Sequence, residues 1–293
     1  MKTFFIINPI SGGQRRDNAE WEHAARINFP DADGAFTKYA GHATELAAQA
    51  VKEGYDQVLA VGGDGTINET AKALVGTQTA LGIIPKGSGN GLARELGIPL
   101  RYEEALAVMQ KASAVSCDVG QANGEYFFNL AGVGIEAEIA RQFAEYGKNG
   151  KRGMWPYFKL GAKAFFSYRP KTLQVQYNGK DEIITPMTLV FANGAQYGSN
   201  FQIAPRASLT DGLFDMVEVS AESKWKLALA APTFFSKTFR PVDITRTSRT
   251  AQAVIRADGE IVYHLDGEPK TANGELKISL LPRALHLLIP PRY

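Results

Sequence analysis

The sequence predicts two domains, an α/β domain with a parallel sheet and a mostly antiparallel β domain after it. Up to Cys117, strand signals alternate with helix signals, a pattern typical of a parallel sheet with helices on both faces. After Cys117, short strand-like runs follow one another instead. We therefore expect domains at residues 1–120 and 121–293, and the last residues are free to return to the first domain.

The elements of the first domain follow from short apolar runs and from one amphipathic pattern. Buried-type strands are expected at Thr3–Ile7, Gln57–Val61 and Ala80–Ile84. Apolar residues at the spacing of one helix face are Ala43, Leu46, Ala47, Ala50 and Val51. Further helices are expected near Asp17–Ile27, Ile67–Leu74 and Tyr102–Lys111.

The second domain is predicted from short apolar runs that lack helical spacing. These runs are Tyr126–Leu130, Leu173–Tyr177, Met187–Ala192, Leu213–Val219, Ala253–Ala257, Ile261–Leu265, Leu276–Leu281 and Leu285–Ile289. Asn178-Gly179 is the favoured two-residue hairpin turn. Two helical stretches, Gly134–Tyr146 and Tyr157–Phe166, interrupt the strands. We expect an antiparallel sandwich or an open barrel.

Composition narrows the class of protein. The 293-residue chain is 45% hydrophobic and 21% charged, the balance of a globular protein. A formal net charge of +2 is too small to indicate a nucleic-acid binder. The single cysteine, Cys117, has no partner for an internal disulfide, which fits a reducing cytoplasm. The apolar run Phe4–Ile7 is too short for a signal-peptide core or a membrane span. We expect a cytoplasmic protein, at most resident on a membrane surface.

Three glycine-rich turns each follow one of the strands expected in the first domain. They are, in chain order, "NPISGG", "GGDGT" and "PKGSGNG". The carboxyl ends of parallel strands meet at one edge of the sheet, where such folds bind ligands. Glycine lets backbone amides approach an anion closely, and Ser11, Thr66 and Ser88 add hydroxyl donors. A single turn of this kind is often only a tight connection, but three on one edge favour a polyphosphate site.

Asp64 lies in the middle of the second turn, where it would repel phosphates unless a cation accompanied them. Mg²⁺ is the ordinary solution, because it bridges phosphates through carboxylates and waters. The Walker A pattern and the G-x-G-x-x-G fingerprint are both absent from the sequence. Neither a P-loop protein nor a dinucleotide-type Rossmann enzyme is therefore expected.

At these turns the sequence resembles a known family. "GGDGTINE" is similar to the signature of the diacylglycerol-kinase catalytic-domain family, which includes bacterial lipid kinases and sphingosine kinases. "NPISGG", "IPKGSGNGLAREL", "CDVG", "FNLAGVGIEAEI", "IAPRASLTDGLFD" and "LDGEP" follow the family's order, so the resemblance covers nearly the whole chain. It implies a Rossmann-like domain of the NAD-kinase and phosphofructokinase type, followed by a C-terminal antiparallel β-sandwich.

The resemblance implies an ATP site at the three turns. The residues that it assigns to nucleotide are Asn8, Pro9, Ile10, Ser11, Gly12, Thr37, Gly62, Gly63, Asp64, Gly65, Thr66, Ile67, Asn68 and Ser88. We add Arg94 as a supporting charge beside the third turn, and we assign Asp64 to Mg²⁺ or its waters. ATP and Mg²⁺ are thus the expected cofactors.

The same resemblance implicates two acids of "LDGE", Asp266 and Glu268, in catalysis beside Asp64. Either acid would accept or orient the proton of the acceptor hydroxyl. On the residues alone, "LDGE" is equally a type I′ hairpin turn with two solvated acids. His264 would share a strand face with Asp266, and we expect it to be a bystander.

A structural metal is implied in the second domain. Bacterial members of the family can carry Mg²⁺ in a "DG" turn, which here points to Ser208, Asp211 and the carbonyl of Leu213. The alternative is an ordinary turn with acids at a strand edge.

Two positions depart from the bacterial members that act on diacylglycerol. Those members commonly have Asp after the Asn of the third turn and often Lys after the first "SG", where this chain has Gly91 and Gly13. "GSGNGLA" is closer to the sphingosine-kinase branch. Diacylglycerol is therefore one of several acceptors that stay open.

The segment Arg141–Lys171, called here the basic–aromatic segment, is the main clue to a membrane. Its cations are opposed only by Glu145 and alternate with Phe, Tyr and Trp residues. Cations attract anionic headgroups while aromatic rings enter the interface, so we expect transient, peripheral docking. The alternative is a solvated helix whose aromatic residues pack on the second domain.

The leading hypothesis is an ATP- and Mg²⁺-dependent lipid kinase that phosphorylates a hydroxyl of a membrane lipid such as diacylglycerol or a sphingoid base. One alternative is a kinase of the NAD-kinase type with a soluble acceptor. The other is a non-catalytic module that binds nucleotide or lipid. The expected partners are a lipid substrate and a membrane surface, with no nucleic acid, and a homodimer stays open.

Overall fold

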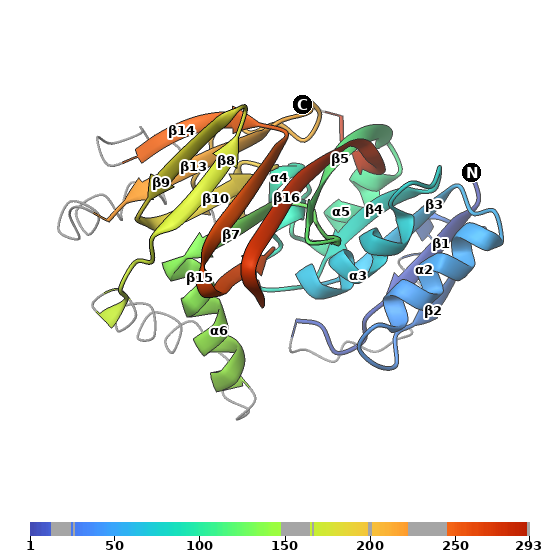
Figure 1. Cartoon of the computed structure of the whole chain (residues 1–293). Helices are drawn as coiled ribbons and strands as arrows, with labels where there is room; N and C mark the ends of the chain where they lie inside the picture. Colours follow the sequence, from blue (N-terminus) through green and yellow to red (C-terminus); the bar gives the residue numbers. More distant parts are fainter. Residues whose placement is uncertain are drawn as a thin grey trace. The chain divides into compact units, whose positions relative to one another are not determined.

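The computed structural model describes residues 1–12, 25, 27–147, 165, 167–198, 201–221 and 245–291 (Figure 1). The chain divides into two compact units. The first contains Met1–Val119, Pro282–Tyr293 and the short piece Gly198–Asn200, and the second contains Gly120–Tyr197 and Phe201–Leu281. The end of the chain therefore belongs to the first unit. Within the described residues, no helix has both the length and the apolar character needed to cross a membrane.

The first unit is built on a parallel sheet. Its strands are β1 (Thr3–Ile7), β2 (Asp33–Phe36), β3 (Gln57–Gly62) and β4 (Ala80–Pro85). They lie in the order β4-β3-β1-β2, and each pair is parallel. Every residue of β3 and β4 is buried, as expected for central strands of an α/β sheet.

Helices connect the strands of the first unit. They are α2 (His42–Lys52), α3 (Asp64–Leu74), α4 (Gly91–Glu95) and α5 (Tyr102–Met109). The buried face of α2 consists of Ala43, Leu46, Ala47 and Ala50, which are four of the five residues expected to form it. The helix predicted near Asp17–Ile27 lies largely outside the described residues.

The second unit holds an antiparallel sheet in the order β14-β13-β10-β7-β15. These strands are β14 (Thr245–Thr250), β13 (Phe214–Ser220), β10 (Pro186–Ala192), β7 (Leu130–Gly134) and β15 (Gln252–Leu265). The remaining strands of the chain are β5 (Ser113–Ala122), β6 (Glu125–Phe127), β8 (Leu173–Tyr177), β9 (Lys180–Ile184), β11 (Gln196–Gly198), β12 (Phe201–Gln202) and β16 (Glu268–Ile289). Of these, β5, β11 and β16 have residues in both units. One helix, α6 (Ile135–Gly147), begins directly after β7.

Asn-Gly and Asp-Gly pairs close three tight hairpins. At Asn178-Gly179 the φ angles are 47° and 74°, so the predicted hairpin between β8 and β9 is present. Asp266-Gly267, with φ angles of 49° and 87°, closes β15 onto β16. Asn123-Gly124 does the same between β5 and β6. Both loop residues are left-handed in each case, which is the type I′ geometry.

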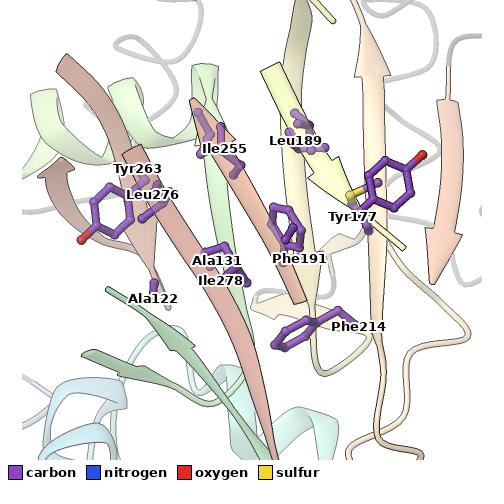
Figure 2. Packing of buried hydrophobic residues seen from close by; sticks show 14 of the residues in the cluster. Ala122, Ala131, Tyr177, Leu189, Phe191, Phe214, Ile255, Tyr263, Leu276 and Ile278 are labelled. Carbon is purple, nitrogen blue, oxygen red and sulfur yellow. The ribbon is translucent and has the colours of Figure 1, made fainter. Parts of the chain in front are cut away.

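The second unit has two buried clusters, one on each face of its sheet. Val190 and Val217 belong to one of them, and the side chains drawn in Figure 2 belong to the other. Figure 2 shows Leu189 and Phe191 of β10, Phe214 at the start of β13, and Ile255 of β15 among its labelled side chains. These four residues are completely buried. Alternate residues of each strand point into this cluster, as period-two alternation requires. The α/β first unit and the antiparallel second unit confirm the predicted fold class.

Several strand predictions were wrong in detail. The two runs expected between Ala253 and Leu265 form one strand, β15, with a register shift between Arg256 and Glu260. The two runs at the end of the chain likewise form one strand, β16, which continues through Pro282 and a left-handed Arg283. Polar residues at a bulge resemble a turn in sequence although the ladder continues beyond them.

Several strands escaped prediction. β2 and β14 lack an apolar pattern, and most of their residues are exposed or half-buried. β5, β7, β11 and β12 were not predicted either. β2 lies at an end of the strand order of the first unit and β14 at an end of that of the second unit, and pairing at such an edge stabilises a strand without burying it.

Candidate active site

The three glycine-rich turns follow adjacent strands of the first unit, at the carboxyl edge of the sheet. The amide of Asn8, after β1, donates to the carbonyl of Val61 in β3 (2.9 Å). The amide of Lys86, after β4, donates to the carbonyl of Gly62 (2.7 Å). Thr37 follows β2 at the same edge, where its amide donates to the carbonyl of Ile7 (2.8 Å). The sheet therefore brings all the turns expected to bind nucleotide into one region.

The second and third turns approach each other so closely that only glycine fits. A Cβ atom on Gly87 would lie 2.7 Å from Cα of Gly63 and 2.9 Å from Oδ1 of Asn90. The first turn also takes part, because a Cβ atom on Gly63 would lie 3.3 Å from Oγ of Ser11. These glycines are needed for contact between turns, whatever ligand they also approach.

Gly65 is different, because nothing lies within 4 Å of the place where its Cβ atom would be. It lies in the first turn of α3, beside Asp64, and both residues are exposed. The fold itself gives no steric reason for glycine at this position.

A polar contact joins the first turn to α3. Nδ2 of Asn8 donates to Oγ1 of Thr66 (2.9 Å), and Oδ1 of Asn8 accepts from the amide of Ile10 (3.1 Å). Thr66 is buried, and a Cβ atom on Gly62 would lie 2.6 Å from its Cβ atom. Asn8, Thr66 and Gly62 thus shape the turns, while Ile10 is exposed.

Asp64 braces the third turn. One of its carboxylate oxygens accepts from the amide of Asn90 (2.8 Å) and the other from the amide of Gly91 (2.7 Å). Asn90 is left-handed (φ 52°) and exchanges two hydrogen bonds with Gly87, at 2.9 and 2.7 Å. The carboxylate therefore caps the start of α4 from a distant part of the chain, a role that its sequence context did not indicate.

A cavity of about 550 Å³ opens beside the third turn. Its polar lining includes Lys86, Ser88, Arg94 and Arg101. Arg94 is anchored by its Nε atom, which donates to the carbonyl of Gly89 (3.0 Å), and Ser88 is exposed. Sequence reasoning selected Ser88 and Arg94 but missed Lys86 and Arg101, because single cations carry no motif.

In the second unit, the two acids of "LDGE" have different surroundings. The carboxylate of Asp266 accepts hydrogen bonds from three successive amides, those of Phe128 (2.8 Å), Asn129 (2.8 Å) and Leu130 (3.0 Å). Its own amide donates to the carbonyl of Leu130 (2.9 Å). Asp266 thus ties the hairpin loop to the start of β7.

Glu268 is the exposed acid of the same hairpin. Its side chain forms no hydrogen bond or salt bridge of standard geometry with any residue that the structure describes, although its charge raises the pKa of nearby Lys270 after the larger effect of Glu125. Its carboxylate is available to a substrate in a way that the carboxylate of Asp266 is not.

Two further ionisable groups lie close to this hairpin. His264 is fully buried, and burial lowers the pKa of its imidazole to about 3. Both carboxyl oxygens of Glu136 are buried, and burial raises the pKa of that carboxyl to about 8. Sequence reasoning treated His264 as a bystander and did not single out Glu136.

The predicted metal residues of the second domain lie in the turn before β13. Asp211 is paired with Arg249, and it also accepts from the amide of Leu213 (3.1 Å). Oγ of Ser208 lies 3.3 Å from Oγ1 of Thr210. Arg249 therefore supplies positive charge to Asp211, and the metal stays a prediction. Over the whole described part of the chain, no three His, Cys, Asp or Glu side chains gather as a metal site would need.

Much of the basic–aromatic segment, residues 148–164 and 166, lies outside the described residues. Of the described members, Arg141 pairs with Glu138 (2.7 Å) and Glu145 (3.4 Å). Phe165 and Tyr168 pack against a buried cluster of the second unit. The packing of these two aromatic residues is what the alternative expects, and membrane docking by the segment stays a prediction.

Comparison with known proteins places the two units in one family. The family described as "Diacylglycerol kinase catalytic domain" matches residues 2–122, and the "YegS C-terminal NAD kinase beta sandwich-like domain" matches residues 129–289. A diacylglycerol kinase of Mycobacterium tuberculosis is 30% identical over 99% of this chain and 95% of its own length. A probable YegS-like lipid kinase of Citrobacter koseri is 31% identical over 86% of this chain and 84% of its own length.

A solved structure agrees with this assignment at the level of the fold. The crystal structure of a putative diacylglycerol kinase from Bacillus anthracis superposes with a TM-score of 0.81 at 23% identity, covering 99% of this chain and 97% of that one. Sequence families over both units and a shared fold lead to the same conclusion. The chain belongs to the diacylglycerol kinase catalytic-domain family and is a lipid kinase.

Proposed function

We propose that this lipid kinase binds the phosphates of ATP at the three turns and transfers the γ-phosphoryl group to a hydroxyl of a membrane lipid. The observation that carries the proposal is the close packing of the turns around Gly63, with open space at Gly65 in the first turn of α3. Amides in the first turn of a helix have no partner within the helix, and the helix dipole favours an anion there.

The charge around the third turn suits phosphate. Lys86, Arg94 and Arg101 line one cavity, and cations placed around a migrating phosphoryl group stabilise the charge of the transition state. Ser88 adds a hydroxyl donor to the same lining. These groups suit the phosphates of ATP.

Asp64 is the residue that would hold Mg²⁺ in the first unit. Each of its oxygens accepts only one amide among the described residues, which leaves a lone pair for a metal-bound water. Mg²⁺ usually keeps several waters and takes the rest of its ligands from substrate phosphates, so one carboxylate is sufficient. The ion would neutralise phosphate charge and align the γ-phosphate.

We assign Glu268 as the residue that accepts or orients the proton of the acceptor hydroxyl, and Asp266 as the residue that holds its loop. Proton removal comes late in a loose phosphoryl-transfer transition state, so orientation of the hydroxyl is the larger part of the task.

The acceptor lipid would lie in the second unit. A cavity of about 270 Å³ is lined there by Val133, Leu173, Ile261 and other apolar residues. Glu138, Arg141, Tyr168, Lys171 and Glu260 add polar groups to the same lining. A pocket whose lining mixes apolar and polar side chains suits a lipid, because an acyl chain and a hydroxylated headgroup need one kind of contact each. Peripheral membrane docking through the basic–aromatic segment, and a homodimer, remain predictions.

The direct test uses radiolabelled ATP, Mg²⁺ and mixed vesicles that contain diacylglycerol, monoacylglycerol, ceramide or a sphingoid base. Label should move to an organic-soluble product with one of these lipids. Label transfer only to NAD⁺, detected as NADP⁺, would instead support a soluble acceptor. Binding of MgATP without transfer to any of them would support the non-catalytic alternative.

Substitution of Gly65 tests the phosphate site directly. Gly65→Ala should leave the thermal midpoint unchanged or slightly raised, because alanine favours helix and meets no neighbour in the protein. It should raise the KM for ATP roughly tenfold, which corresponds to about 1.4 kcal/mol of lost binding. Steady-state kinetics and thermal unfolding provide the two readouts.

Gly87→Ala is the matched comparison, because its Cβ atom would collide with the backbone of Gly63. This variant should lose stability as well as ATP affinity. If Gly65→Ala bound ATP as tightly as the wild type, phosphate would not lie at the start of α3.

The proposed role of Asp64 predicts a change in metal dependence. Asp64→Asn should raise the Mg²⁺ concentration needed for half-maximal turnover, measured at saturating ATP. It should also lower stability by about 1–3 kcal/mol, because an amide group would then face a backbone amide that had a carboxylate partner. A lowered stability with an unchanged Mg²⁺ requirement would limit Asp64 to bracing the third turn.

A further inference from the structure

His264 forms a hydrogen bond to the hairpin loop that presents Glu268. The Nδ1 atom of its ring lies 3.2 Å from the amide nitrogen of Gly267 and accepts from it. The ring is completely buried, so it is neutral, and its proton resides on Nε2. The histidine thus contacts the loop residue immediately before Glu268.

Space for this ring depends on a glycine in the neighbouring strand. Gly132 of β7 is the register partner of His264 in β15. A Cβ atom on Gly132 would lie 2.6 Å from Nε2 of His264 and 2.5 Å from Oε1 of Glu136. The imidazole and a buried carboxyl therefore share the space above one backbone position.

The surroundings of this pair are closed. Glu136 comes from the first turn of α6, which packs on β7, β10 and β15. The hydroxyl of Thr188 in β10 lies near its carboxyl and favours the charged form. Burial raises the pKa of the Tyr168 phenol, and the nearby charge of Glu136 raises it further. Neither carboxyl oxygen of Glu136 has a hydrogen bond of standard geometry to a described residue.

The loop itself needs support. Asp266 is a non-glycine residue in the left-handed region, which costs about 1–2 kcal/mol relative to ordinary backbone. Its carboxylate anchors one end of the loop through the amides of residues 128–130. The Gly267 amide is held only by His264 among the hydrogen bonds of the described residues, and it precedes Glu268 directly.

We propose that His264 is a positioning residue for phosphoryl transfer, which fixes the loop so that Glu268 points at the acceptor hydroxyl. The inference rests on the proposed role of Glu268. A proton acceptor that is misplaced by about 1 Å can lose a factor of about 10² in rate, so a part-buried hydrogen bond to the adjacent amide is enough to matter.

Two substitutions of nearly equal shape test the proposal. In His264→Asn, the amide oxygen can take the place of Nδ1 and accept from Gly267, whereas His264→Leu has the same branching without an acceptor. We expect His264→Leu to lower kcat about 10- to 100-fold with an unchanged KM for ATP. His264→Asn should retain most of the wild-type kcat.

Stability separates positioning from folding. Because position 264 is buried, the His264→Leu variant should unfold at the same temperature as the His264→Asn variant or at a higher one. A low kcat of His264→Leu would then not reflect an unfolded fraction. Thr188→Val serves as the control, because it removes a buried hydroxyl close to Glu136 without touching the loop. It should keep the wild-type kcat.

The outcomes are distinguishable from a failure of the proposed function. If Glu268→Gln stays active, the role assigned to Glu268 is wrong. If Glu268→Gln is inactive but His264→Leu turns over like the wild type, the positioning inference alone is overturned. Equal losses in the leucine and asparagine variants would also overturn it, because the acceptor at Nδ1 would then not be what matters.

Discussion

Glu268→Gln should lower kcat by about 10² to 10⁴, the range that loss of a positioned proton acceptor produces. The KM for ATP should stay close to the wild-type value, because the residues proposed to bind nucleotide belong to the first unit. The thermal midpoint should also stay unchanged, since Glu268 is exposed and forms no hydrogen bond with the described residues. Initial rates with labelled ATP and lipid vesicles, beside thermal unfolding, measure all three quantities.

Asp266→Asn is the variant to compare with Glu268→Gln, because both acids belong to one hairpin. An asparagine would place an NH₂ group against backbone amides that now donate to a carboxylate. Leaving such donors without acceptors costs about 1–3 kcal/mol for each, so this variant should unfold at a lower temperature. If Asp266→Asn were stable but inactive while Glu268→Gln stayed active, the catalytic role would belong to Asp266 rather than to Glu268.

The conformational freedom of glycine explains why much of the first unit could be predicted from the sequence. Three glycine-rich turns after three buried strands indicate a common edge, and the parallel order of β4, β3 and β1 confirms it. The family resemblance added the order of the motifs, and the matches over both units confirm that resemblance. Each of these features lies within a short stretch of the chain, so it can be recognised from one amino-acid sequence.

The partners of Asp64 could not be predicted in the same way. Its carboxylate accepts from Asn90 and Gly91, more than twenty residues away, and this depends on the left-handed backbone at Asn90. An aspartate at this place in "GGDGT" could equally be a metal ligand or a helix cap. Only the contact between two turns shows that bracing is one of its tasks.

His264 illustrates a second limit. Strand alternation places it on one face with Asp266, but it does not show that Gly132 lies opposite and leaves room for Glu136. The register of β7 against β15 is a long-range property of the sheet. A buried polar pair of this kind leaves no periodic signal in the chain.

This buried pair should shape how stability depends on pH. Glu136 has a folded-state pKa of about 8, above its ordinary value of 4.5, so its contribution to stability is complete below pH 4.5 and is lost as pH rises to about 8. His264 has a pKa of about 3, below its ordinary 6.5, so its contribution is complete above pH 6.5 and is lost as pH falls. Between pH 4.5 and 6.5 the two slopes oppose each other, and the wild type should show a plateau there.

Glu136→Gln should remove the alkaline half of this profile. Each unit of pKa shift corresponds to about 1.4 kcal/mol, so relative to its value at pH 4.5 the wild type should lose on the order of 4 kcal/mol by pH 8 through this carboxyl. The glutamine variant has no proton to release and should keep a nearly constant free energy of unfolding from pH 6.5 to 9. Urea titrations at half-unit pH steps measure the difference between the two proteins.

His264→Leu is the complementary variant, and it should show only the fall from pH 4.5 to 8. Because stability depends on the difference in bound protons between the folded and unfolded states, the two curves together identify which group is responsible for each slope. If the pair were instead a carboxylate and an imidazolium, each charge would stabilise the other. Removing either partner would then lower stability at neutral pH, and Glu136→Gln would be less stable than the wild type at pH 7 rather than more stable.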